Sequence, residues 1–180
     1  MRFLVSAALA ILLALPVQAR PLAEGEQADL MKAVGAYLRA TGNGNAEKIV
    51  STIPPRVLNV FAGTAGIEAS KVQKTLTEQT AELLKATKFS DLSAGEGPFD
   101  AKDETMADGT VVTWVVVPTE FTSEANGKKT RNQQPLLALL EDGKWYFTRI
   151  DGPQQQQLVG FAYPFIVDAK LPEASATPLP

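Results

Sequence analysis

The chain has 180 residues and a formal net charge of −3 at pH 7, and it contains neither Cys nor His. This composition excludes disulfides, nucleophile systems that use Cys or His, and the zinc or iron sites that draw on imidazole and thiolate. The lysines and arginines are scattered, so we expect no nucleic-acid surface, and we expect neither a metal nor a cofactor.

The chain begins with the features of a secretory leader. Arg2 precedes an apolar run from Phe3 to Leu15, and a proline and small residues follow it. We predict a signal peptide over residues 1–19 with cleavage after Ala19, because the run is shorter than the roughly 20 residues of a membrane span. The expected location is periplasmic, with secretion as the alternative, and no membrane span is expected after cleavage.

The first predicted helix covers residues 24–41. Leu30, Val34 and Leu38 recur at helical spacing, and Gly42 is a natural stop. This apolar stripe predicts that one face of the helix packs against the rest of the domain.

Further helical segments should follow up to about residue 87. Asn45 can cap the second helix by accepting a backbone N–H. Pro54 and Pro55 end that helix, and Pro55 suits the first turn of the next one. The most regular segment is expected from about Ser70 to Thr87, with apolar residues on one stripe and charged residues elsewhere.

After Phe89 the hydrophobic pattern changes to a period of two. The pairs Asp108-Gly109, Asn126-Gly127 and Asp142-Gly143 are each preferred in tight hairpins. An antiparallel sheet of four to five strands is therefore expected over about residues 88–151. Because the helices precede the sheet, the predicted class is α+β, with N-terminal helices packed on a curved, cone-like antiparallel meander.

The single α+β domain is expected to span residues 20–167 and to end with a short helix. That helix is predicted over about residues 153–163, with Asp151 as its cap and Leu158 and Phe161 as its anchors. Residues 168–180 are rich in Pro, Ala and Ser, and they are expected to form a disordered tail.

Counting residues from the hairpin turns assigns side chains to the two faces of the sheet. If each turn pair closes a two-residue loop, Leu140 faces both Trp145 and Thr113. Both faces then read as apolar, whereas a sheet with one wet face alternates with polar residues. Helices should cover one face. The second face is expected to be covered by a homodimer through the sheet, by the C-terminal segment folding back, or by a separate protein partner.

The same counting brings Glu104, Thr113 and Arg149 onto one face. Together with Tyr146 they are the candidate ligand-binding residues, at the charged end of a pocket between helix and sheet. The alternative is structural: acids near Glu104 guard an edge strand, and Arg149 reaches water along its own stem. No catalytic residue is assigned.

The stretches "YLRATGNGNAEKI" and "LLALLEDGKWYFTRID", set in this order of helices and strands, resemble the NTF2-like, cystatin-like superfamily. The resemblance in layout covers about Ala28 to Asp151. It implies a curved sheet that wraps a long helix, commonly with a pocket and often with dimerisation through the sheet. The superfamily contains isomerases, dehydratases and non-catalytic binding modules, so the resemblance leaves the activity open.

We therefore expect an exported, non-enzymatic binding or interaction protein. It would hold a small apolar ligand between helix and sheet, bind an envelope protein, or self-associate through an apolar sheet face. One alternative is a small isomerase or dehydratase that uses a carboxylate with Tyr146 or Tyr37. Another is a structural envelope or assembly factor.

Overall fold

The computed structural model describes residues 19–180, so residues 1–18 of the predicted leader lie outside it. Five α-helices and a seven-stranded antiparallel sheet make up this part of the chain. The elements are β1 (Arg20–Pro21), α1 (Glu24–Gly42), α2 (Ala46–Val50), α3 (Pro55–Ala65), α4 (Ala69–Ala86), β2 (Lys88–Ala94), β3 (Asp100–Thr105), β4 (Val111–Ala125), β5 (Lys128–Glu141), β6 (Lys144–Arg149), α5 (Pro153–Ala162), the 3₁₀ helix η1 (Pro164–Ile166) and β7 (Ser175–Pro178).

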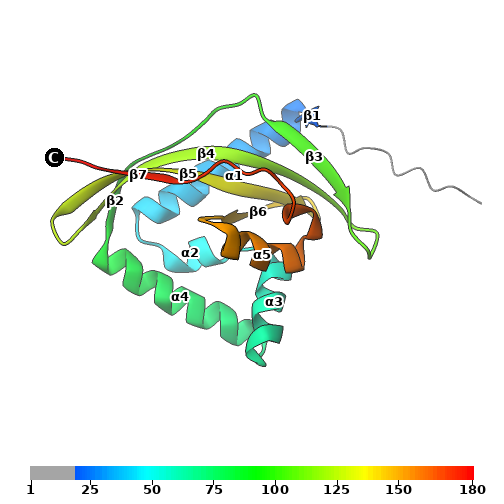
Figure 1. Cartoon of the computed structure of the whole chain (residues 1–180), viewed down its shortest axis with the longest axis horizontal. Helices are drawn as coiled ribbons and strands as arrows, with labels where there is room; N and C mark the ends of the chain where they lie inside the picture. The colour runs from blue at the N-terminus through cyan, green and yellow to red at the C-terminus, as the bar shows by residue number, and fades with distance from the viewer. Residues whose placement is uncertain (1–18) are drawn as a thin grey trace, which may run out of the picture.

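The sheet is curved and open, and its main strand order is β1-β3-β4-β5-β6 (Figure 1). The short strand β2 pairs with the C-terminal half of β4, and β7 pairs with the N-terminal half of β5. The predicted α+β class, with helices followed by a curved antiparallel sheet, is confirmed. Within residues 19–180, no helix is long and apolar enough to cross a membrane.

Helix α1 packs along one face of the sheet. Glu26 accepts a hydrogen bond from the backbone N–H of Ala23 (2.9 Å), and the acidic first turn suits the positive end of the helix dipole. Leu30 and Val34 are almost completely buried against the sheet. The apolar stripe predicted for this helix therefore packs into the hydrophobic core between the helix and the sheet.

Local signals define the next helices as expected. Asn45 caps α2 by accepting the backbone N–H of Lys48 (2.9 Å), and Pro55 opens α3. Helix α4 forms as predicted, but it lies on the far side of α2 and α3 from the sheet (Figure 1), and Val72 is its one buried residue. Its apolar stripe is thus only partly covered.

Two hairpin turns set the register of the central strands. Asn126 and Asp142 have positive φ angles of 51° and 52°, as a type I′ turn requires, and a glycine follows each. The predicted pairs Thr113 with Leu140 and Leu140 with Trp145 are present. These two registers are confirmed.

The register predicted at Asp108-Gly109 is wrong by one residue. The loop runs from Met106 to Thr110, because Met106 and Thr110 bond through their backbones (2.8 Å) and Asp108 accepts the Thr110 N–H (3.0 Å). Asp103 consequently faces Thr113, and Glu104 faces Val112 on the opposite side of the sheet.

Both faces of the sheet are covered by the chain itself. The first cluster lies between α1 and the sheet. The second lies between the sheet and α3, α5 and η1, and it contains Trp114, Leu139, Val159, Tyr163 and Ile166. The C-terminal segment thus covers the face on which the expected homodimer depended.

Two expectations for the C-terminal region are wrong. Phe161 is 77% exposed, and Val159 and Tyr163 anchor α5 instead, because these two residues lie on the side of the helix that packs into the second hydrophobic cluster. The tail is not irregular throughout, since β7 pairs with Thr130–Gln133 of β5. That stretch of β5 extends beyond β6, so its free edge is available to the tail.

Candidate functional site

A small cavity lies between α1 and the curved sheet. Its volume is about 20 Å³. Residues of α1, β2, β4, β5 and β6 line it: Tyr37, Leu38, Thr41, Phe89, Leu92, Thr119, Phe121, Gln134, Leu136 and Arg149. One buried water needs roughly 10–15 Å³, so this space admits a group of about one to three atoms and no whole ligand.

A bulge in β2 helps to close the cavity. Asp91 has a positive φ of 54°, and the pairing with β4 shifts between Ser90 and Ser93. Leu92 therefore lies against the end of α1, where a Cβ at Gly42 would stand 3.3 Å from its Cδ1. A side chain at Gly42 would therefore press on Leu92, which forms one wall of the cavity.

Gln134 supplies a buried polar group at this cavity. It is 8% exposed, and its Oε1 atom has no hydrogen-bond partner among the described residues. The backbone carbonyl of Gln134 accepts a hydrogen bond from Thr119 Oγ1 (2.6 Å), which links β5 to β4 at this position. Trp114 Nε1 and Trp145 Nε1 are also buried without partners, but neither tryptophan lines this cavity. Burial of an unpaired polar atom costs about 1–3 kcal/mol.

Arg149 and Tyr37 bring charge and a hydroxyl to the same space. The guanidinium of Arg149 lies over the ring of Phe121 at 5.7 Å, and Arg149 forms no ion pair within residues 19–180. The ring of Tyr37 packs on Phe147 at 5.5 Å. Burial raises the pKa of Tyr37, so its hydroxyl stays protonated at neutral pH, and the Arg149 charge acts in the opposite direction.

An open groove adjoins the cavity and shares Thr41 and Phe89 with it. This outer groove has a volume of about 460 Å³. It is lined by the end of α1, the end of α4 and the start of β2, with Leu84, Thr87, Lys88, Ser90 and Glu124 among its residues. Together, the cavity and the outer groove offer a narrow, mostly apolar space that holds Gln134 and Arg149, and a wider exposed groove.

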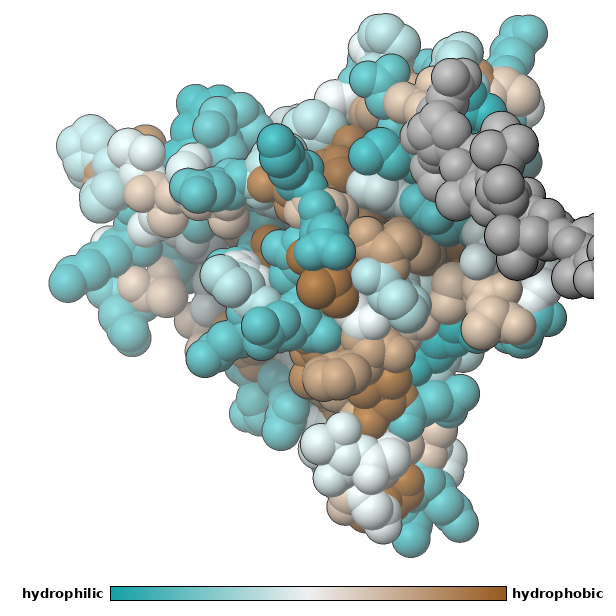
Figure 2. All heavy atoms as spheres, turned by 45° about the vertical axis from the view of Figure 1, so that its right-hand side comes forward, coloured by the Kyte–Doolittle hydropathy of each residue, from teal (hydrophilic) through white to brown (hydrophobic). Residues whose placement is uncertain are grey.

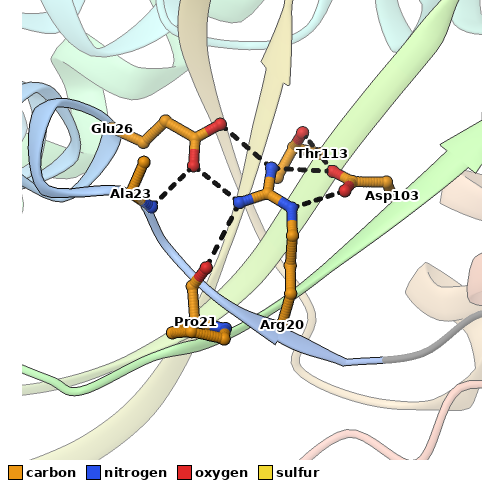
Figure 3. A network of polar contacts seen from close by, with 6 residues as sticks. All are labelled: Arg20, Pro21, Ala23, Glu26, Asp103 and Thr113. Atoms are coloured by element: carbon orange, nitrogen blue, oxygen red, sulfur yellow. Dashed lines mark hydrogen bonds and ion pairs between the residues drawn. The ribbon is translucent and has the colours of Figure 1, made fainter.

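The structure does not bring the other predicted site residues to Arg149. Thr113 donates to Asp103 (2.6 Å) at the β1 end of the sheet, and Asp103 binds Arg20 (Figure 3). Arg20 also binds Glu26 of α1 (2.7 Å), so one guanidinium joins β1, β3 and α1. The Arg20 hydrogen bonds hold the pKa of Asp103 and of Glu26 below their ordinary values.

Glu104 and Tyr146 lie on the opposite face from Arg149. The shifted register carries Glu104 there, and the ring of Tyr146 lies under Lys144 Nζ at 4.6 Å. Of the four candidate ligand-binding residues, Arg149 alone lines the cavity, and Tyr37, named for the enzyme alternative, joins it.

A second polar cluster fastens the C-terminal cover to the sheet. Tyr163 donates to the buried carboxylate of Glu141 (2.8 Å), which also binds Arg56 of α3. Arg56 reaches Asp108 in the β3–β4 loop (2.8 Å). Burial and the Glu141 bond raise the pKa of Tyr163, and the Thr110 N–H and Arg56 lower that of Asp108 to about 2. Both carboxylate oxygens of Glu141 are hydrogen-bonded, so this cluster has a structural role and holds the C-terminal segment on the sheet.

An apolar groove lies between α3 and α4, with a volume of about 330 Å³. Its walls include Phe61, Ile67, Val72 and Leu76, and Ile67 is 43% exposed. Figure 2 shows apolar side chains at the surface on this side of the molecule, among hydrophilic ones. Exposed apolar surface of this kind is typical of contact sites.

Sequence reasoning missed Gln134 although the necessary signal was present. Continuing the count across Asn126-Gly127 by two residues beyond Leu136 places Gln134 on the face of Arg149, opposite Thr119. The Glu141 cluster had no such signal, because its members lie far apart in the chain and follow no period. Among the described residues, no three Asp or Glu side chains come together as metal ligands.

Comparison with known proteins gives no relative: no protein family, no curated protein and no solved structure matches this chain.

Proposed function

We propose that the protein is a non-enzymatic, exported binding protein that takes the polar end of a small molecule into the cavity between α1 and the sheet. The observation that carries this proposal is that the buried, unpaired Gln134 Oε1 lies at one small cavity together with the exposed Arg149, which forms no ion pair within residues 19–180. A buried polar group without a partner requires an explanation, and a ligand supplies one.

The cavity geometry favours binding over catalysis. No carboxylate is among the residues that line the cavity, which leaves it without an acid or base for proton transfer to a bound molecule, although Asp151 lies close enough to raise the pKa of Tyr37. The small volume also changes the expected ligand, because it favours a molecule that places only a headgroup in the cavity and its remainder in the adjoining outer groove over one wholly enclosed between helix and sheet.

Replacing Gln134 by Leu tests the proposal. If the amide is kept for a ligand, Gln134→Leu should raise the free energy of unfolding by about 1 kcal/mol, because an unpaired buried group is removed. The same change should abolish the NMR shifts that hexanoate, hexanamide or hexan-1-ol, each added alone, cause in residues lining the cavity. Gln133→Leu, on the exposed side of β5, is the control and should leave those shifts intact. Absence of shifts with every probe in the wild-type protein contradicts the proposal.

A second candidate function is self-association through the α3–α4 groove. It is favoured by the exposed Ile67 and the apolar walls around it, and it replaces the sheet face as the surface for a homodimer, since that face is covered. The proposed partner is a second copy of the protein, which is always available. Sedimentation at several protein concentrations tests for this dimer directly.

A further inference from the structure

The residues of the proposed binding site favour one chemical class of ligand, and this preference rests on the proposed function. Of the arginines near the sheet, Arg20, Arg56 and Arg131 each pair with a carboxylate. Arg149 pairs with none among the described residues, and its guanidinium is held over the ring of Phe121 at the cavity. Arg149 is exposed, so water solvates its charge when no ligand is bound, and an anionic group at the cavity can replace this water because charge-assisted hydrogen bonds are about twice as strong as neutral ones.

The shape of the cavity selects among anions. Its volume of about 20 Å³ corresponds to roughly one or two waters, which is enough for a flat group of three heavy atoms. A tetrahedral phosphate or sulfate has five heavy atoms and fits this narrow space less well. A carboxylate is flat and also matches the fork of a guanidinium in two-point contact.

The other polar groups of the cavity can complete the binding of such a headgroup. Tyr37 brings a neutral hydroxyl, which can donate. Gln134 makes no side-chain hydrogen bond within residues 19–180 that would resist a half-turn of its amide, and this turn presents Nε2 as a donor in place of Oε1. Leu38, Leu92 and Leu136 line the same space and suit the carbon atom next to the carboxylate.

We propose that the cavity is a carboxylate-binding site, in which Arg149, Tyr37 and the turned amide of Gln134 hold the headgroup of a small organic acid whose chain lies in the outer groove. Two sources have this chemistry: an aliphatic acid and the C-terminus of a peptide. The outer groove mixes Leu84 and Phe89 with Thr87, Ser90 and Asn43, so either chain finds partners there.

The test compares headgroups on a constant chain. Hexanoate, hexanamide and hexan-1-ol are titrated into the protein and followed by NMR, with the Gln134 side-chain amide as reporter. Hexanoate should bind at least about tenfold more tightly than hexan-1-ol, a difference of roughly 1.4 kcal/mol. Methylphosphonate, which is tetrahedral, should leave the Gln134 amide unchanged. N-acetyl-Ala-Ala shows whether a peptide carboxylate is bound better than hexanoate.

The variants separate failure of this inference from failure of the proposed function. Arg149→Gln should lower hexanoate affinity about tenfold to the level of hexan-1-ol and leave hexan-1-ol binding unchanged. Arg131→Gln removes the same charge from an exposed position on the same strand pair and should change neither. Equal binding of hexan-1-ol and hexanoate overturns the carboxylate preference alone. No shift at the cavity with any probe overturns the proposed function as well.

Discussion

A single guanidinium joins three elements at the start of the domain. Arg20 makes two-point contacts with both Asp103 and Glu26, which are only partly exposed. Because the bonds to Arg20 lower the pKa of both carboxyls, their charged forms are favoured in the folded state. The resulting stabilisation is fully present above the unfolded pKa values of about 4 and is lost as the pH falls through the lower folded values.

Arg20→Gln should reduce the free energy of unfolding by about 1 kcal/mol at neutral pH, after allowance for solvent screening of partly exposed groups. The difference between variant and wild type should shrink as the pH falls below about 4, since the carboxyls then lose their charge. Urea unfolding across this range measures it. Lys85→Gln breaks an exposed ion pair with Glu82 on α4 and should have little effect at any pH. A pH-independent loss in Arg20→Gln would contradict the electrostatic explanation.

The Tyr163 hydroxyl is the link between the C-terminal cover and the sheet. Tyr163→Phe removes the donor to buried Glu141, so the free energy of unfolding should fall by about 1–2 kcal/mol. Tyr146→Phe is the matched control, because Tyr146 is partly exposed on the same face and lies under Lys144. Chemical denaturation of both variants checks this. Equal stabilities for the two would show that the hydroxyl of Tyr163 contributes nothing.

At the scale of elements, the turns that were predicted correctly are those whose chemistry is local. Asn126-Gly127 and Asp142-Gly143 impose positive φ angles, and these alone set the registers. Asp108-Gly109 has the same composition but closes a longer loop, since Asp108 is drawn to Arg56 and to the Thr110 N–H. The hydrogen bonds within the loop from Met106 to Thr110 and the contact with the distant helix α3 accompany that register, and the Asp-Gly pair alone does not reveal it.

The candidate site divides in the same way. Arg149 was found because strand counting reaches it, and Gln134 lies within reach of the same count. The closure of the cavity depends on Leu92 in a bulge of β2 and on the position of α1 against the sheet. Both are tertiary features. Strand β7 was missed because it is exposed throughout, and backbone pairing to a free edge leaves no hydrophobic pattern.

Removing β7 should act on one stretch of β5. A chain that ends at Glu173 should exchange the amide hydrogens of residues 130–133 faster, because this edge loses its backbone partners. The thermal midpoint should change little, since β7 buries no side chain. Hydrogen exchange measured by NMR tests this, with the amides of Leu137–Leu139, paired on both sides, as the internal reference. Unchanged exchange at residues 130–133 would show that β7 does not hold the edge in solution.

At the scale of the whole molecule, one apolar surface that the chain leaves exposed lies between α3 and α4. If two copies meet there, the sedimentation coefficient should rise with protein concentration, and Ile67→Asp should weaken the dimer at least about tenfold. Leu83→Asp places the same charge on α4 at a 52% exposed residue outside this groove and should behave like wild type. A wild-type protein that is monomeric at every concentration would exclude this function of the groove.

The pairing of both terminal strands sets how this domain can be joined to others. β1 lies along the outer edge of β3, β7 lies along β5, and the two ends of the described chain are on opposite sides of the molecule (Figure 1). Insertion of one domain into a loop of another requires ends that lie close together. This domain is therefore suited to a linear array or an end-to-end fusion. Its insertion into a tight loop of another domain would force the two ends of that loop away from each other.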